Sequence, residues 1–82
     1  MKLYEYKTKY LSKIALYSPK NEREKEIKDL IMNKLYSIRT MTLPYLVHTL
    51  YLAIEREKDI SDELKGIFEE MIADAGEIES SE

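Results

Sequence analysis

The sequence predicts an all-α fold, a small antiparallel bundle of four helices, or alternatively three helices with an N-terminal arm. Three observations predict it. Apolar residues recur at helical spacing in four segments. The connections between these segments are only a few residues long, which favours antiparallel neighbours. The chain has 82 residues, of which 44% are hydrophobic, and this length suits a single core.

One domain is expected. It spans residues 1–76, and residues 77–82 are expected to form a short, acidic, disordered tail. The chain shows no internal repeat that would divide it further.

The first helix is expected from about Lys2 to Tyr17. A face with helical spacing predicts it, formed by Leu3, Tyr6, Tyr10, Ile14 and Tyr17. Residues 4–10 also alternate between Tyr or Thr and charged residues, as a half-buried strand would. A lone strand would leave its backbone hydrogen bonds unsatisfied, so helix is favoured.

The second helix has two competing start signals. Ser18 and Pro19 offer an N-cap hydroxyl followed by a proline in the first turn, whereas Asn21 and Glu24 have the spacing of a capping box. The apolar stripe then continues to about Thr40, through Ile27, Leu30, Ile31, Leu35 and Ile38.

Two further helices follow. The third is expected from Thr42, which can act as a cap, to about Lys58, with Pro44 in the first turn. The fourth begins after a cap at Asp59 or Ser61 and ends at Gly76 in a left-handed conformation. Its apolar face consists of Leu64, Ile67, Phe68, Met71, Ile72 and Ala75.

Composition excludes several classes. The chain has no cysteine, which excludes disulfides and thiol chemistry and favours a reducing, cytoplasmic compartment. No secretory signal is expected, because the first residues lack an apolar segment. The longest stretch without a charged side chain, residues 40–54, is too short to cross a membrane. The absence of glutamine and the abundance of Lys and Glu are typical of thermophilic proteins.

The net charge of −3 conceals an asymmetry. Residues 1–41 contain ten basic and five acidic side chains, a balance of +5, whereas residues 42–82 contain three and eleven, a balance of −8. Such a division indicates charged partners or a directional field rather than a particular fold.

The second and third predicted helices carry more apolar side chains than one core-facing stripe needs. Opposite the stripe of the third helix, which includes Tyr51, lie Tyr45, His48 and Leu52. Met32 and Tyr36 fall away from the stripe of the second helix, beside Arg39. Either these side chains pack within the monomer, which predicts that they are mostly buried, or they form an interface, since interfaces are enriched in Tyr, Met and Arg.

The favoured function is a non-catalytic accessory or adaptor protein that binds a larger protein. Its predicted interface is Met32, Tyr36, Arg39, Tyr45, His48 and Leu52. In composition the chain is similar to small, cysteine-free helical proteins of thermophilic archaea. Some of these are accessory subunits of polymerases and other nucleic-acid machines, so the similarity implies a subunit of a DNA- or RNA-processing complex.

Two alternatives remain open. One is a nucleic-acid-binding module that uses the basic side chains Lys2, Lys7, Lys9, Lys13 and Arg39. The other is a homodimer whose assembly supplies additional core burial.

No catalytic centre is expected. The only histidine, His48, has no acidic neighbour at ligand spacing, and the acids of residues 59–63 are better explained as helix caps than as a calcium loop. The two glycines do not form a phosphate-binding loop. We therefore expect no enzyme activity, cofactor, metal, small-molecule substrate or membrane contact.

Overall fold

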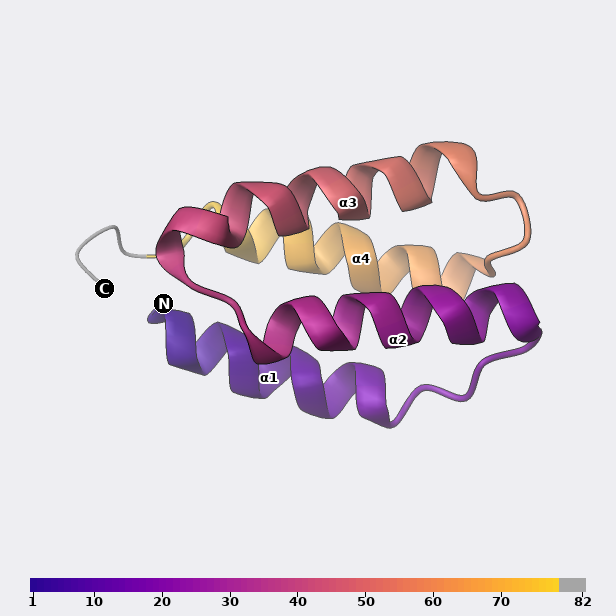
Figure 1. The fold of residues 1–82 in the computed structure, drawn as a ribbon, viewed down its shortest axis with the longest axis horizontal. Helices are drawn as coiled ribbons and strands as arrows, with labels where there is room; N and C mark the ends of the chain where they lie inside the picture. Colours follow the sequence, from indigo (N-terminus) through magenta and orange to yellow (C-terminus); the bar gives the residue numbers. More distant parts are fainter. Residues whose placement is uncertain (79–82) are drawn as a thin grey trace.

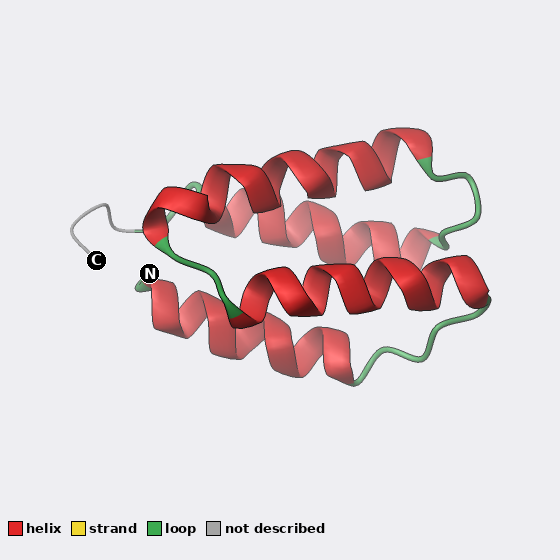
Figure 2. Cartoon of the chain, viewed as in Figure 1, coloured by secondary structure: helices red, strands yellow, loops and turns green. Residues whose placement is uncertain are grey.

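The computed structural model describes residues 1–78, which form a bundle of four helices (Figures 1 and 2). The elements are α1 (Leu3–Ala15), α2 (Glu22–Tyr36), the 3-10 turn η1 (Thr40–Thr42), α3 (Leu43–Arg56) and α4 (Asp62–Ala75). Each helix packs against the next, and α4 returns against α1. The predicted four-helix bundle is confirmed, and residues 1–78 contain no strand. The alternative with an N-terminal arm is wrong, because α1 is an integral helix of the ring.

The core is built from all four helices. Tyr6 and Tyr10 of α1 are fully buried and send their hydroxyls toward α4. The Tyr6 hydroxyl donates to the Met71 carbonyl at 2.9 Å, and the Tyr10 hydroxyl donates to the Asp74 carboxylate. These bonds satisfy polar atoms that burial would otherwise penalise, and they tie α1 to α4. The other core side chains are Ile14, Tyr17, Ile27, Ile31, Leu35, Ile38, Leu46, Leu50, Ala53, Ile60, Leu64, Phe68 and Met71.

Ion pairs also join α1 to α4. The Lys9 ammonium lies 2.8 Å from the Asp74 carboxylate, and the Lys13 ammonium lies 2.7 Å from a Glu70 oxygen. Lys20, in the connection between α1 and α2, contacts Glu63 at 3.3 Å. Opposite charges from the two halves of the chain therefore meet within the monomer.

Helix α2 begins at the second of its two start signals. The Asn21 side chain accepts a hydrogen bond from the Glu24 N–H at 2.8 Å, so Asn21 is the N-cap, and the start at Ser18 and Pro19 is wrong. Only half of the capping box forms, because the Glu24 carboxylate turns into the bundle rather than back to the Asn21 N–H. The helix ends at Tyr36 instead of Thr40, and Ile38 is buried from the connection that follows.

The predicted caps near α3 and α4 are partly corrected. Thr42 does not cap α3; its hydroxyl accepts from the Arg39 N–H at 3.0 Å and closes η1. Ser61, rather than Asp59, caps α4 by accepting from the Leu64 N–H. Gly76 is right-handed, with φ −69°, so the left-handed prediction is wrong.

Helix bounds and core faces differ from the prediction at a few positions. Helix α1 stops at Ala15, although Tyr17 still reaches the core, and α3 stops at Arg56. Leu30 and Tyr51, both expected on core stripes, are 47% and 49% exposed. Each lies at the edge of its stripe, where the side chain faces a groove between neighbouring helices.

The two ends of the described chain lie close together (Figure 1). The Met1 ammonium donates to the Glu77 carbonyl at 3.1 Å, and Ile78 packs against the core. The remainder of the predicted tail, residues 79–82, lies outside the described residues. Among the helices of residues 1–78, none is both long enough and apolar enough to cross a bilayer.

Candidate docking site

Large apolar side chains lie exposed around the connection between α2 and α3. Tyr36 at the end of α2 is 60% exposed, Met41 in η1 is 77% exposed, and Tyr45 in the first turn of α3 is 69% exposed. Ile38 and Leu46 from the same region are buried. The connection therefore turns one set of apolar side chains into the core and leaves another in solvent.

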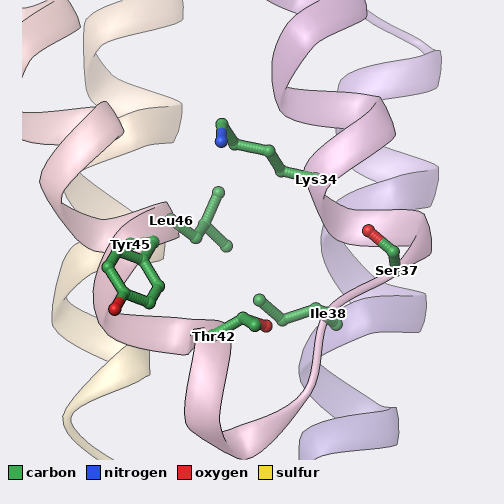
Figure 3. Close-up of a pocket in the computed structure, with 6 residues that line it drawn as sticks. All are labelled: Lys34, Ser37, Ile38, Thr42, Tyr45 and Leu46. Atoms are coloured by element: carbon green, nitrogen blue, oxygen red, sulfur yellow. The ribbon is translucent and has the colours of Figure 1, made fainter.

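A hollow of about 300 Å³ lies between the end of α2 and the start of α3 (Figure 3). It is lined by Lys34, Ser37, Ile38, Thr42, Tyr45 and Leu46. The buried side chains of Ile38 and Leu46 provide an apolar base, and Figure 3 shows Lys34 extending from α2 toward α3.

A second hollow adjoins the first and shares Ser37 and Ile38 with it. Its lining residues are Leu3, Lys7, Tyr36, Ser37, Ile38, Arg39, Thr40 and Met41. The Lys7 ammonium donates to the Tyr36 carbonyl at 2.8 Å, which caps the end of α2. Among residues 1–78, no acidic residue lines either hollow, so this part of the surface is both apolar and basic. We call Lys34, Tyr36, Arg39, Met41 and Tyr45 the connection surface.

The structure brings together only part of the predicted interface. Tyr36, Arg39 and Tyr45 belong to the connection surface. Leu52 lies farther along the bundle, half-buried in a hollow that it shares with Leu30. Met32 packs partly against the core, and His48 is exposed without contributing to the connection surface.

Packing within the monomer accounts for some residues of the predicted interface and not for others. Packing within the monomer predicted that Tyr36 and Tyr45 would be buried, and both are exposed. Met32 and Leu52 are partly covered, as packing would require. Met41 was missed, because it lies in the short connection, where helical periodicity carries no information.

A buried carboxylate organises the opposite end of the bundle, where the α1–α2 and α3–α4 connections meet. Glu24 is fully buried and accepts hydrogen bonds from the Tyr17 hydroxyl at 2.7 Å and the Ser61 N–H at 2.6 Å. The Lys20 N–H donates to it at 2.7 Å. Burial alone would raise its pKa, but these hydrogen bonds outweigh desolvation and lower the pKa of Glu24 to about 2.

This cluster is structural rather than catalytic. A carboxylate with a pKa near 2 is a weak base, and the Glu24 side chain is closed to solvent. The sequence did contain a signal for it. Glu24 lies three residues before Ile27 and seven before Ile31, on the core stripe itself, where a charged side chain requires internal partners.

The basic side chains proposed for nucleic-acid contact are largely engaged within the chain. Lys9 and Lys13 pair with α4, and Lys7 bonds to the end of α2. Arg39 lies on the connection surface. The basic residues of α1 thus do not form a separate patch of uncommitted charge.

Within residues 1–78, no group of three or more His, Asp or Glu side chains is arranged to hold a metal ion. The fold and surfaces define a small helical bundle with an exposed apolar and basic surface at one end. No protein-family model matches this chain, and no curated protein or solved structure matches it significantly.

Proposed function

We propose that this protein is a non-catalytic accessory or adaptor protein that binds a larger protein through the connection surface. One observation carries the proposal: Tyr36, Met41 and Tyr45 are each at least 60% exposed and lie around two adjoining hollows that, within the described part of the chain, are lined by cations and no acid. Exposed aromatic and Met side chains beside hollows are features of binding surfaces rather than of a solvated helix face.

The chemistry of the surface indicates the kind of partner segment. Tyr36 and Tyr45 offer large apolar area with a polar tip, which makes tyrosine a frequent anchor in interfaces. Lys34 and Arg39 add positive charge that would steer an acidic segment and fix its register. The expected partner segment therefore presents apolar side chains flanked by Asp or Glu.

Site-specific photo-cross-linking tests the proposal in native extract. A benzoyl-phenylalanine at position 45 is expected to capture one partner protein. The same group at position 16 is the control, because Leu16 is 84% exposed and lies directly after the C-terminal end of α1, outside the connection surface. The captured protein would then be purified for binding measurements.

Affinity measurements with that partner complete the test. The double variant Tyr36→Ala/Tyr45→Ala is expected to weaken binding at least about ten-fold, because truncating anchor side chains typically costs more than ~1 kcal/mol each. Leu16→Ala should leave affinity unchanged. Capture at position 16 alone, or equal affinity for both variants, would contradict the proposal.

The proposal also covers the location of the protein and the kind of complex to which it belongs. The cysteine-free composition supports a cytoplasmic location. Membership of a DNA- or RNA-processing complex is supported by composition alone. The nucleic-acid-binding and homodimer alternatives stay predictions, and the first has less support because Lys7, Lys9 and Lys13 have partners within the chain.

A further inference from the structure

A second groove runs between α3 and α4, on a different face of the bundle. Two hollows that share Tyr51 and Ile72 make up this groove. Its apolar walls include Leu43, Val47, Tyr51 and Ile54 from α3 and Ile72 from α4. Tyr51 is half-exposed, and Val47, Ile54 and Ile72 are only partly covered. The groove is therefore an apolar surface that the monomer leaves open.

The shape of the groove suits a helix. Leu43, Val47 and Ile54 lie on one face of α3 at helical spacing, and the span from residue 43 to residue 54 is about 16 Å at 1.5 Å per residue. That length matches about three turns of a partner helix, which would present apolar side chains at i, i+4 and i+7. Small side chains at Ala73, Ala75 and Gly76 allow close approach on the α4 side.

The charge of the groove is opposite to that of the connection surface. Glu55 and Glu69 line one end, both are exposed, and neither has an ion-pair partner among residues 1–78. In the described part of the chain, no basic residue lines either hollow of the groove. An occupant with positive charge at that end would neutralise these carboxylates.

We infer that the α3/α4 groove is a second docking site, which takes an amphipathic helix of a partner protein with lysine or arginine at the end that meets Glu55 and Glu69. With the connection surface this gives two separate binding sites of opposite charge on one small bundle. The protein would then bridge two partners rather than bind one.

A second copy of the chain is a poorer occupant. In a two-fold dimer the groove would face its own equivalent, and because no basic residue among residues 1–78 lines it, Glu55 and Glu69 would meet no cation in either relative orientation of the two copies. Carboxylates enclosed at an interface without a cation destabilise it. A heterologous contact between the groove and the connection surface of another copy is a separate outcome, which sedimentation detects.

Model peptides test the inference directly. The probe is a leucine–lysine peptide of about fifteen residues with leucine at helical spacing, long enough for three to four turns. The control is the same peptide with glutamate in place of lysine. Calorimetry gives the affinities, and amide chemical shifts locate the site. Micromolar binding of the lysine peptide is expected, with shift changes at Val47, Tyr51 and Ile72 and much weaker binding of the glutamate peptide.

Charge reversal separates the groove from general attraction to an acidic protein. Glu55→Lys/Glu69→Lys is expected to weaken the lysine peptide about ten-fold, through the loss of two favourable contacts and the gain of two repulsive ones. The matched variant Glu22→Lys/Asp29→Lys changes the net charge equally at exposed positions of α2 and should have little effect. Tyr36→Ala/Tyr45→Ala should leave peptide binding unchanged, so this test is independent of the proposed function.

Three results would overturn the inference. Equal weakening by the two charge-reversal variants would mean that the peptide senses net charge only. Shift changes on a face other than α3/α4 would place the peptide elsewhere. Sedimentation of the wild type as a dimer that Tyr51→Ala converts to a monomer would show that a second copy covers the groove.

Discussion

The Glu24 carboxylate accepts hydrogen bonds from both the α1–α2 connection and the α3–α4 connection. Its hydrogen bonds come from Tyr17 and the Lys20 backbone, which are near it in sequence, and from the Ser61 backbone, which is 37 residues away. The Ser61 hydroxyl lies 2.7 Å from the Tyr17 hydroxyl and also caps α4. A buried charge with all these partners is stable in place, whereas loss of the charge would leave several donors unpaired.

Acid should therefore weaken the fold over a defined range. The pKa of Glu24 falls from its ordinary value of 4.5 to about 2 in the folded protein. Its contribution to the free energy of unfolding is complete above pH 4.5 and is lost as the pH falls toward 2. Urea unfolding followed by circular dichroism at several pH values between neutral and 2 would measure the decline.

Glu24→Gln provides the control for that titration. The variant should lose about 2 kcal/mol of stability at neutral pH, since hydrogen bonds to charged groups contribute about 1.5–3 kcal/mol. The free energy of unfolding of this variant should also fall less steeply in acid. Some pH dependence remains, because the pKa values of Asp74 and Glu57 are also lowered in the folded protein. An acid profile as steep as that of the wild type would show that Glu24 is not responsible.

At the scale of elements, the start of α2 offers a direct comparison of two caps. Asn21→Ala should destabilise the protein by about 1 kcal/mol, because the side chain both accepts from the Glu24 N–H and donates to the Asp59 carbonyl at 2.8 Å. Ser18→Ala, at the rejected start, should change stability by less than about 0.5 kcal/mol. Chemical denaturation of both variants makes the comparison, and the reverse ranking would place the cap at Ser18.

Gly66 offers a stabilising change within α4. It lies in the interior of the helix, is exposed, and a Cβ added there would meet no atom within 4 Å. Gly66→Ala should therefore raise the free energy of unfolding by about 0.5–1 kcal/mol, since alanine loses less backbone entropy in a helix. A rise in the thermal midpoint would confirm this, and a fall would indicate that another contact approaches the site.

The sequence predicted the helices well and their ends less well. Periodicity placed all four segments, because each presents several apolar side chains to one core. The ends depend on single hydrogen bonds, and competing caps such as Ser18 and Asn21 look alike until the neighbouring chain is in place. The 3-10 turn at residues 40–42 was not predicted, because it forms from local bonds between Arg39 and Thr42.

At the scale of the whole molecule, the charge asymmetry of the sequence acquires a structural explanation. The basic α1 lies beside the acidic α4, and the ion pairs at Lys9 and Lys13 bring together parts of the chain separated by more than fifty residues. Exposed ion pairs add little stability individually. Their contribution here is to favour the arrangement in which the first and last helices are neighbours.

Exchanging the charges of one pair tests this. Lys13→Glu should cost up to about 1 kcal/mol, and adding Glu70→Lys should restore most of it, because the double variant re-forms the pair in reverse. Lys25→Glu, at an exposed position of α2, serves as a control for net charge. Urea unfolding in low and high salt would measure the cycle, and no recovery in the double variant would assign the cost to side-chain packing.

The candidate docking site was predicted in part. The sequence identified Tyr36, Arg39 and Tyr45 because they depart from the core stripes of their helices. It did not separate them from Met32, which neighbouring helices partly cover, and it placed Tyr51 on a core stripe although this side chain is half-exposed at the edge of that stripe. The grooves form between helices, so their lining depends on how the helices pack, and periodicity within one helix does not contain that information.

Because Met1 and Glu77 are in contact, the chain could be joined there and its helices connected in a different order without changing how they pack. A linker of about five glycine and serine residues would join these two positions without stretching. New ends opened at Lys58, in the exposed connection before α4, would yield a circular permutant that begins with the acidic helix and ends with α3. The same four helices would then pack in the same arrangement, although the ribosome would synthesise them in a different order.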